Sequence, residues 1–395
     1  MKTNNNIPAY RFQGYTDAWE LRKLGEVMEV TSVKRIHQSD WTDFGVRFLR
    51  ARDIVAESKN ESVSEPLFIS QKKYDEYTAI SGKVTKGDLL VTGVGTIGIP
   101  MLIEKNEPIY FKDGNIIWFK NENHIDGQFF YYSFIGKKIQ SFIKESAGIG
   151  TVGTFTINTG KNTPIDLPVL KKEQEAIGTF FSTLDRHITL HQRKLDTLKE
   201  QKKTYLKLLF PAKGQTKPAL RFQGFEDDWK EVKLGELCDI RTGKLDANAM
   251  VENGEYDFYT SGIKKYRIDV AEFEGPAITI AGNGATVGYM HLADGKFNAY
   301  QRTYVLTNFK VDRRYIFSEI AKKLPIKIQQ EARTGNIPYI VLSMLTELSI
   351  SLPSLPEQKA IGTFFQTLDQ EIAQVEDKLA SLKEMKKTLL RKLFV

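Results

Sequence analysis

Two pairs of matching segments divide this chain into two copies of one plan. Residues 8–30 and 218–240 agree at 12 of 23 positions with an offset of 210, and residues 173–210 and 357–394 agree at 23 of 38 positions with an offset of 184. These matched ends enclose 142 residues in the first copy (31–172) and 116 in the second (241–356). A repeat of this kind predicts one structural unit used twice, which gives the chain a pseudo-twofold internal symmetry. The unequal middles predict that the two copies share a frame and differ in what the frame carries.

The repeated tail predicts a long helix in each copy, over residues 174–209 and 358–393. Apolar residues recur with a period of 3.5 over five heptads, which is typical of a coiled coil, and the nearest partner for each helix is the helix of the other copy. The seam positions are Ile177, Phe181, Leu184, Ile188, Leu195 and Leu198 in the first helix, and Ile361, Phe365, Leu368, Ile372, Val375, Leu379 and Leu382 in the second. Lys202 and Lys386 occupy the same seam position, either as polar residues that select the register or as side chains that snorkel from a fraying end.

The rest of each copy reads as a mixed, strand-rich domain, so the fold class is α+β. Short strands are expected within residues 87–94, 99–104 and 109–120 of the first middle, and within 276–284, 287–292 and 300–307 of the second. Helices are expected at 127–146 and 313–332, the latter kinked or ended near Pro325. Proline and glycine then mark 211–217 as a linker. The expected segments are domain 1–170, helix 171–210, linker 211–217, domain 218–355 and helix 356–395.

The composition agrees with a nucleic-acid partner but does not require one. The net charge is +7 and the pI is about 9.0, with 56 basic and 49 acidic residues. Cys238 is the only cysteine, so no disulfide can form within the chain. No apolar run approaches the length of a membrane span, and residues 1–7 are polar. A cytoplasmic protein without a membrane partner is therefore expected.

Glycine-rich segments follow an apolar run in both copies. Gly93, Gly95 and Gly98 match a dinucleotide-binding pattern, but Pro100 and β-branched residues follow instead of a helix, and the corresponding segment at residues 282–288 has one extra residue. We interpret both as turns between strands. The exposed amides of Gly95, together with Thr96, Asn283 and Thr286, are candidates for close approach to a DNA backbone.

Other chemical motifs are weak. Residues 336–339 (Asn-Ile-Pro-Tyr) resemble the N-P-P-Y loop of amino-methyltransferases, but the second position is wrong and no glycine loop for S-adenosylmethionine precedes them, so a turn is the better interpretation. Gly160-Lys161 is not a phosphate-binding loop, because Asn162 follows. The i, i+4 pair His187 and His191 has no counterpart in the second copy and reads as surface and seam histidines. The chain is therefore expected to bind no metal and no cofactor and to contain no catalytic residue.

Basic and aromatic residues concentrate in the two middles. Such side chains contact phosphates or read guanine edges. The candidates are Lys34, Arg35, Arg47, Arg50 and Arg52 in the first copy, and Arg241, Lys244, Lys264, Lys265, Tyr266, Arg267, Gln301 and Arg302 in the second. Each alone is an ordinary surface residue, so the prediction rests on the set.

Taken together, the chain resembles the DNA-specificity subunits of type I restriction-modification systems over nearly its whole length. The resemblance rests on two copies of EQ-x-A-I-G-T-F-F-x-T-L-D before the long helix, the I-x-L-P strands at 165–168 and 350–353, and the W-x-x-x-x-L-G-E segments at 19–26 and 229–236. It implies a target recognition domain in each copy, an antiparallel helical spacer, and a bipartite asymmetric site in double-stranded DNA. It also implies assembly with two modification subunits and two restriction and translocation subunits, so that S-adenosylmethionine, ATP and Mg act on those partners.

Two alternatives stay open. A coiled-coil adaptor whose middles bind proteins would explain the heptads but not the basic middles. A standalone methyltransferase is opposed by the missing cofactor loop.

Overall fold

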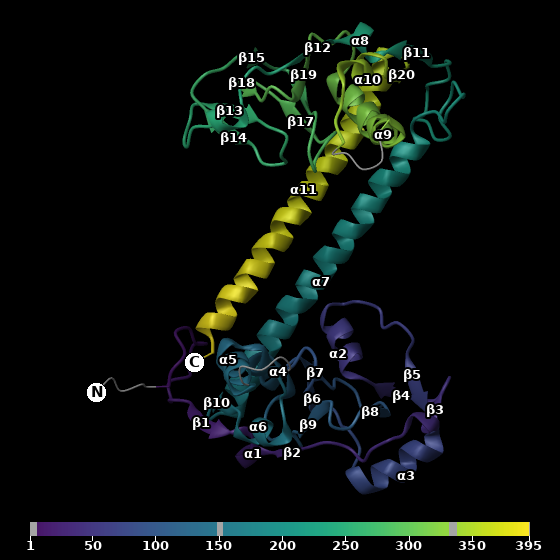
Figure 1. The fold of residues 1–395 in the computed structure, drawn as a ribbon. Coiled ribbons are helices and arrows are strands. Elements are labelled where there is room, and N and C mark those ends of the chain that lie inside the picture. Colours follow the sequence, from purple (N-terminus) through teal and green to yellow (C-terminus); the bar gives the residue numbers. More distant parts are fainter. Residues whose placement is uncertain (1–5, 148–152, 332–337, 395) are drawn as a thin grey trace. The chain divides into compact units, whose positions relative to one another are not determined.

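A computed structural model describes residues 6–147, 153–331 and 338–394, and the structural statements below concern these residues (Figure 1). They form two compact units. Unit 1 contains Met1–His191 and Lys378–Val395, and unit 2 contains Gln192–Asp377. Each unit therefore combines one copy of the repeat with a part of the other copy's long helix.

The elements of unit 1 come from the first copy. Its strands are β1 (Glu20–Lys23), β2 (Glu29–Thr31), β3 (Trp41–Thr42), β4 (Val46–Leu49), β5 (Leu67–Ile69), β6 (Leu89–Thr92), β7 (Pro100–Leu102), β8 (Ile109–Phe111), β9 (Ile116–Lys120) and β10 (Pro164–Leu167). Its helices are α1 (Leu24–Val27), α2 (Ala51–Ser58), α3 (Gln71–Ser81), α4 (Gly127–Ile135), α5 (Lys137–Ser146) and α6 (Ile157–Asn162), with a 3-10 turn at Gln38–Asp40.

The elements of unit 2 follow the same plan with fewer helices. Its strands are β11 (Lys230–Lys233), β12 (Asp239–Thr242), β13 (Tyr256–Tyr259), β14 (Tyr266–Ile268), β15 (Phe273–Glu274), β16 (Ala277–Ala281), β17 (Met290–Ala293), β18 (Lys296–Ala299), β19 (Thr303–Thr307) and β20 (Ser349–Leu352). Its helices are α8 (Leu234–Leu237), α9 (Arg313–Glu331) and α10 (Leu342–Thr346), with a 3-10 turn at Ala247–Ala249.

Sheet topology confirms that the two copies share a frame. The central sheet has the order β2-β9-β6-β7 in unit 1 and β12-β19-β16-β17 in unit 2, antiparallel throughout. A two-stranded ribbon pairs β1 with β10 and β11 with β20. The second sheet differs more, β3-β5-β4-β8 against β14-β13-β18-β15, although both contain one parallel pair, β4 with β8 and β13 with β18. The α+β class with two strand-rich domains is thus confirmed.

The expected elements of the middles are found with two differences. A kink or an end was expected near Pro325, and helix α9 runs through this proline to Glu331, so the helix does not end there. The expected helix at 127–146 is two helices, because the Gly136 N–H bonds the Ser133 carbonyl at 3.0 Å and its extended backbone separates α4 from α5. Residues 336 and 337 of the Asn-Ile-Pro-Tyr segment lie outside the described residues.

The two long helices are α7 (Lys171–Leu208) and α11 (Leu355–Lys392), three residues earlier at their start than expected. They run antiparallel, because within unit 2 Lys194 pairs with Glu371 at 2.7 Å, whereas Phe210, just beyond the end of α7, stacks on Phe365 with ring centroids 5.9 Å apart. Of the thirteen predicted seam residues, all but Ile188 and Ile372 are buried. The coiled coil expected from the heptads is present.

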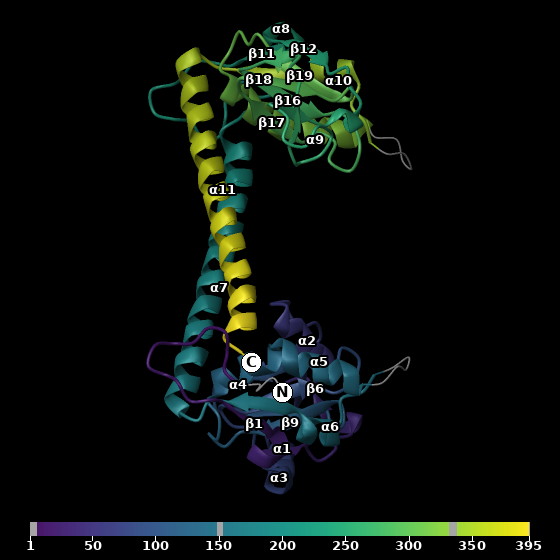
Figure 2. The same ribbon diagram turned by 90° about the vertical axis from the view of Figure 1, so that its left-hand side faces the viewer.

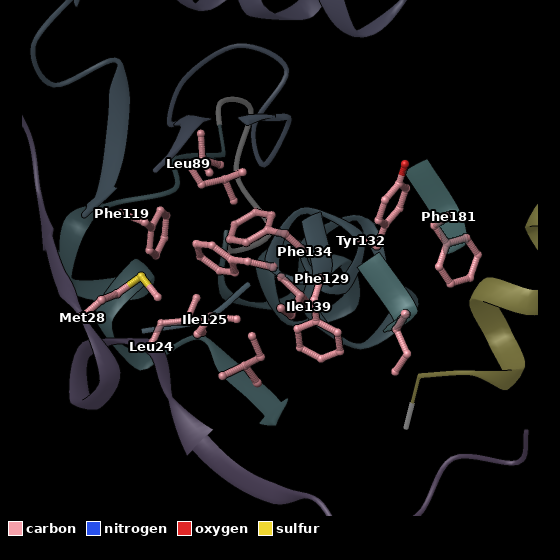
Figure 3. Close-up of a cluster of buried hydrophobic side chains, with 14 of the residues drawn as sticks. Leu24, Met28, Leu89, Phe119, Ile125, Phe129, Tyr132, Phe134, Ile139 and Phe181 are labelled. Atoms are coloured by element: carbon pink, nitrogen blue, oxygen red, sulfur yellow. The ribbon is translucent and has the colours of Figure 1, made fainter. Parts of the chain in front are cut away.

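Each unit's core is completed by the end of the other copy's helix. In unit 1 the core gathers the central sheet, α4 and the start of α7 around Phe129 and Phe181 (Figure 3). Phe394, just beyond α11, packs on these two rings at 5.5 and 5.8 Å. In unit 2 Phe210 packs in the same way on Tyr315 and Phe365. Full burial of a phenylalanine contributes roughly 2 to 3 kcal/mol. Phe210 is buried and Phe394 is partly buried, so both exchanged residues help to bind the two copies together.

The start of each copy lies beside the end of the other copy's helix. The Tyr10 N–H donates to the Lys392 carbonyl at 2.8 Å, and the N-terminal segment lies next to the end of α11 in both views (Figures 1 and 2). The equivalent bond in unit 2 joins the Leu220 N–H to the Leu208 carbonyl at 2.9 Å. The two copies are thus joined in the same manner at both places.

A nearly buried ion pair fixes the start of each long helix. Arg11 donates two hydrogen bonds to Glu173, at 2.7 and 2.8 Å, and Arg221 donates two to Glu357, both at 2.8 Å. Both glutamates are almost completely buried. Because a buried carboxylate needs a partner for its charge, the glutamate at the start of each repeated tail is explained by this contact within the chain.

Candidate nucleic-acid interface

The glycine segments are turns between strands, as the sequence predicts. One joins β6 to β7 and the other joins β16 to β17. The first glycine of each turn donates its N–H to the turn before β9 or β19. Gly93 donates to the Asn115 carbonyl and Gly282 donates to the Arg302 carbonyl, both at 2.8 Å. A Cβ on Gly282 would lie 2.3 Å from the Arg302 carbonyl oxygen, so this approach requires glycine. The same edge of the central sheet therefore has the same construction in both units.

Three chain segments meet at this edge in each unit. They are the glycine turn, the β8–β9 or β18–β19 turn, and the segment that follows β2 or β12. In unit 2 the contact is direct, because the Gln301 N–H donates to the Leu245 carbonyl at 2.8 Å and the Gly243 N–H donates to the Thr303 carbonyl at 3.2 Å. We call this place the turn edge.

In unit 1 the turn edge carries a cavity of about 510 Å³ that gathers several predicted residues. Arg35, Arg50 and Arg52 line it, together with seven residues that were not predicted: Ile36, His37, Gln38, Trp41, Ala51, Lys112 and Asn115. We call it the basic cavity. The other two basic candidates lie elsewhere, with the Lys34 ammonium 5.0 Å from the ring centre of Tyr77 and the Arg47 guanidinium 5.8 Å from that of Phe68.

The three arginines of the basic cavity differ in how they are held. Arg50 donates to both oxygens of the buried Asp53 at 2.9 and 3.0 Å and to the Glu65 carbonyl at 2.8 Å, so it orients the N-terminus of α2. Arg35 is mostly exposed and lies 3.9 Å from Asp113. Arg52 lies 3.6 Å from Glu65. Separations of this length are not hydrogen bonds, which leaves both guanidinium groups suited to an external acceptor.

The glycine turns contain four further predicted residues, two in each unit. Gly95 is in the left-handed region with φ +69°, and the Thr96 carbonyl accepts a bond from the Thr92 hydroxyl at 2.5 Å. In unit 2 the Asn283 side-chain oxygen accepts from the Ser261 hydroxyl at 2.6 Å, and the Thr286 hydroxyl donates to the Ser261 carbonyl. Asn283 and Thr286 are thus brought together by the loop after β13.

The basic candidates of unit 2 fall into two groups. Lys244, Gln301 and Arg302 lie at the turn edge, where Lys244 pairs with Glu272 at 2.6 Å and the Gln301 amide lies 3.4 Å from Asp246. Arg241, on the adjoining strand β12, lies over the Phe273 ring at 5.5 Å. The second group surrounds the β13–β14 turn: Lys264, Lys265, Tyr266 and Arg267. Lys265 and Arg267 both pair with Asp257, at 3.1 and 2.6 Å.

A cluster of aromatic rings around β17 was not predicted from the sequence. The His291 ring on β17 packs between Tyr259 and Tyr289, with centroids 5.2 and 4.9 Å away. Burial lowers the pKa of His291, so this imidazole is neutral at pH 7. A tyrosine or histidine in a strand gives no signal of its own in the sequence. Two segments bring these rings together, since Tyr259 lies on β13 whereas Tyr289 and His291 belong to the β16–β17 hairpin.

Among the residues that the structure describes, no group of three or more histidine, cysteine, aspartate or glutamate side chains is arranged to hold a metal ion. The His191 ring bonds the His187 carbonyl through Nδ1 at 2.8 Å. Burial raises the pKa of the Cys238 thiol to about 12.

In the described part of the chain, no helix is both long and apolar enough to cross a membrane.

Comparisons with known proteins agree with this architecture. The family model of the type I restriction modification DNA specificity domain matches residues 16–200 and again 226–384. The specificity subunit of the type I restriction enzyme EcoDI of Escherichia coli is 38% identical over 164 residues, which cover 42% of this chain and 36% of that subunit. A Mycoplasma genitalium protein named as a type I specificity subunit is 23% identical over 350 residues, 85% of this chain and 90% of that protein.

A solved structure has the same fold. The crystal structure of a type I restriction-modification S subunit from M. genitalium matches with a TM-score of 0.71 and 19% identity, and the match covers 98% of this chain and 99% of that one. Since the family model matches most of each copy, the chain belongs to the DNA-specificity subunits of type I restriction-modification systems.

Proposed function

We propose that each unit reads one half of a bipartite, asymmetric site in double-stranded DNA and that the coiled coil sets the gap between the halves. The observation that carries this proposal is the turn edge. The hydrogen bond from its glycine turn to the turn before β9 or β19 is the same in both units, whereas its side chains differ: Arg35, Lys112 and Asn115 in unit 1, and Lys244, Gln301 and Arg302 in unit 2. One frame with two sets of donors is what two different half-sites require.

The coiled coil is also proposed to dock two modification subunits, with two restriction and translocation subunits completing the complex in the cytoplasm. In this proposal S-adenosylmethionine binds to the modification subunits, and ATP and Mg act on the restriction subunits. The chain itself supplies specificity and no catalytic residue. Its long helices present mainly polar and charged residues outside the seam, including Lys194, Lys199 and Glu376 in exposed ion pairs, which suits a surface that other subunits cover reversibly.

A domain exchange tests the proposal. Residues 31–167 are replaced by the matching middle of a related specificity subunit, and the hybrid is expressed with the modification subunit in a host whose methylated sites are then sequenced. One half-site is expected to change while the other half and the gap stay the same. A simultaneous change in both halves would contradict two independent readers. Equal binding of the parental complex to specific and random duplex at low salt would instead favour a protein-interaction adaptor.

A further inference from the structure

We infer that the basic cavity of unit 1 binds a phosphate group of the DNA backbone and so fixes the position of this unit on its half-site. The inference rests on the proposed function and assigns a chemical role to one part of it. It concerns a contact that holds the DNA in place, in contrast to a contact that reads a base.

The first support is the charge of the lining. Of the ten lining residues, Arg35, Arg50, Arg52 and Lys112 are cationic and none is acidic. Two carboxylates nearby lie outside the lining. Asp53 holds Arg50 at 2.9 and 3.0 Å, whereas Asp113 pairs loosely, 3.7 Å from Lys112 and 3.9 Å from Arg35. A concave site with several cationic donors and no anion in its wall favours a compact anion such as a phosphate.

The second support is the helix that opens on the cavity. Residues 50–52, which form the N-cap and first turn of α2, are part of the wall. The N-terminus of a helix carries a partial positive charge and points backbone N–H groups at a bound anion. Asp53 is held by the Arg50 side chain and backbone N–H, at 2.9 Å for the latter, so its charge is already neutralised within the protein.

The third support is the shape of the site. Double-stranded DNA presents its phosphates as convex ridges, whereas base edges lie at the bottom of grooves and are reached by protruding elements. A cavity of about 510 Å³ walled by Trp41, Ile36 and the α2 N-terminus is concave, and so it fits the ridge. The glycine turn that adjoins it through the Gly93–Asn115 hydrogen bond exposes Gly95 and Thr96 and is better suited to approach a groove.

A larger cavity in the same unit provides the contrast. It measures about 790 Å³ and is lined by Glu57, Glu104, Glu107 and Asp185 against Lys105 and Arg186. Burial raises the pKa of Glu57, and Glu104 adds to this while Arg47 opposes it, so negative charge is already crowded there. Phosphate is disfavoured at that cavity, which leaves the basic cavity as the better site for the DNA backbone.

The test uses the full chain in complex with its modification subunit and a fluorescent duplex that carries the parental site. The variants are Arg35→Ala, Lys112→Ala and Arg35→Lys, with Arg22→Ala as the matched control. Arg22 lies on β1 and is exposed. It pairs with Glu20 and Glu26 and does not line the cavity. Arg35 is also exposed, so its loss should leave the melting temperature unchanged.

Arg35→Ala and Lys112→Ala are each expected to weaken DNA binding about tenfold, because each variant loses one charge-assisted hydrogen bond. The slope of log K against log salt should fall by about 0.9 for each phosphate that the variant no longer neutralises. The order of preference among duplexes with single base changes should stay the same. Arg35→Lys should bind within about threefold of the parent, because phosphate binding depends more on the positive charge than on the planar geometry of the guanidinium group. Arg22→Ala should change neither the affinity nor the salt slope.

Neutral methylphosphonate groups, placed singly along the half-site, identify the phosphate that is bound. One position is expected to weaken the parental complex and to have no further effect on the Arg35→Ala, Lys112→Ala double variant. Altered base preference in Arg35→Ala that Arg35→Lys does not restore would overturn the inference in favour of base reading. Unchanged affinity and salt slope in the double variant would overturn it as well. Loss of discrimination in the parental complex itself would refute the proposed function, and this result is distinguishable from the other two.

Discussion

Lys202 of α7 lies 2.5 Å from the carboxylate of Asp369 on α11, and the equivalent residues of the other pairing, Lys386 and Asp185, lie 2.6 Å apart. The sequence allowed two explanations for these polar seam lysines. They could select the register of the two helices, or their side chains could snorkel into solvent from a fraying helix end. Because each pairs with an aspartate on the facing helix, at positions related by the repeat offset of 184, the structure favours register selection.

Reversing one of these pairs tests that role. Lys202→Asp places two carboxylates together and should destabilise the chain by about 1 kcal/mol, since both side chains remain partly exposed. Adding Asp369→Lys should recover most of this loss. The free energy of unfolding from urea titrations of the parent, both single variants and the double variant gives the coupling. Additive effects of the two changes would mean that the pair does not define the register.

The glycine within each E-Q-x-A-I-G segment allows α7 or α11 to approach a second helix closely. A Cβ on Gly362 would lie 2.7 Å from the Asp312 carboxylate and 2.8 Å from the Tyr315 backbone nitrogen. Alanine normally stabilises a helix relative to glycine by about 1 kcal/mol, but Gly362→Ala should destabilise the chain by about 1 to 3 kcal/mol because of this overlap. The neighbouring exposed Thr363→Ala is the control and should stay within about 0.5 kcal/mol of the parent.

The β13–β14 hairpin predicts a dependence of stability on pH. Burial alone would raise the pKa of Asp257, but its bonds with Lys265 and Arg267 outweigh burial and lower it below 3.8. A lowered pKa in the folded state contributes stability above the unfolded pKa, and this contribution is lost as the pH falls through the folded value. Asp257→Asn should therefore cost about 1 kcal/mol at pH 6 and less at pH 3.

Urea titrations of the parent and of Asp257→Asn at the two pH values measure this difference. Equal destabilisation at pH 6 and pH 3 would show that the charge of Asp257 makes no contribution to the hairpin.

Deleting one heptad from each long helix tests the proposed gap. Removing residues 195–201 and 379–385 keeps the seam in phase and retains both lysine–aspartate pairs, which lie outside the deleted segments. The loss is about 10 Å of helix, or about three base pairs and about 100° of rotation around the duplex. The variant should fold and should methylate a site with a shorter gap or lose the parental site. A library with fixed half-sites and gaps of about three to nine base pairs measures this, and an unchanged optimum would exclude the coiled coil as the ruler.

The frame could be predicted from the sequence because it is repeated and periodic. The heptads identify both long helices, and the apolar runs identify β6 and β16 with their glycine turns. The second sheets could not be predicted in the same way. Strands such as β3 and β14 have two or three residues, too short for an alternating pattern to stand out. Helix α2 begins at Ala51 and has Arg50 as its N-cap with Asp53 as the cap partner, which is not the usual serine or threonine signal.

The candidate site was predicted as a set and less well as individual residues. Arg35 and Arg52 were named from their charge, and so was Arg50, although Asp53 already holds its guanidinium group. His37 and Lys112 were not named, because they come from segments 75 residues apart that only the turn edge brings together. Whether a basic side chain faces solvent or a carboxylate depends on tertiary contacts, which spacing along the chain does not encode.

Phe394 and Trp19 pack edge to face, 6.3 Å between centroids, although they come from opposite ends of the sequence. During synthesis the first unit to emerge from the ribosome must wait for one of the last segments before its core is complete, whereas unit 2 receives Phe210 early. Contacts between residues so distant in sequence form slowly. Until Phe394 has been synthesised, the nascent first unit therefore keeps this part of its apolar core uncovered.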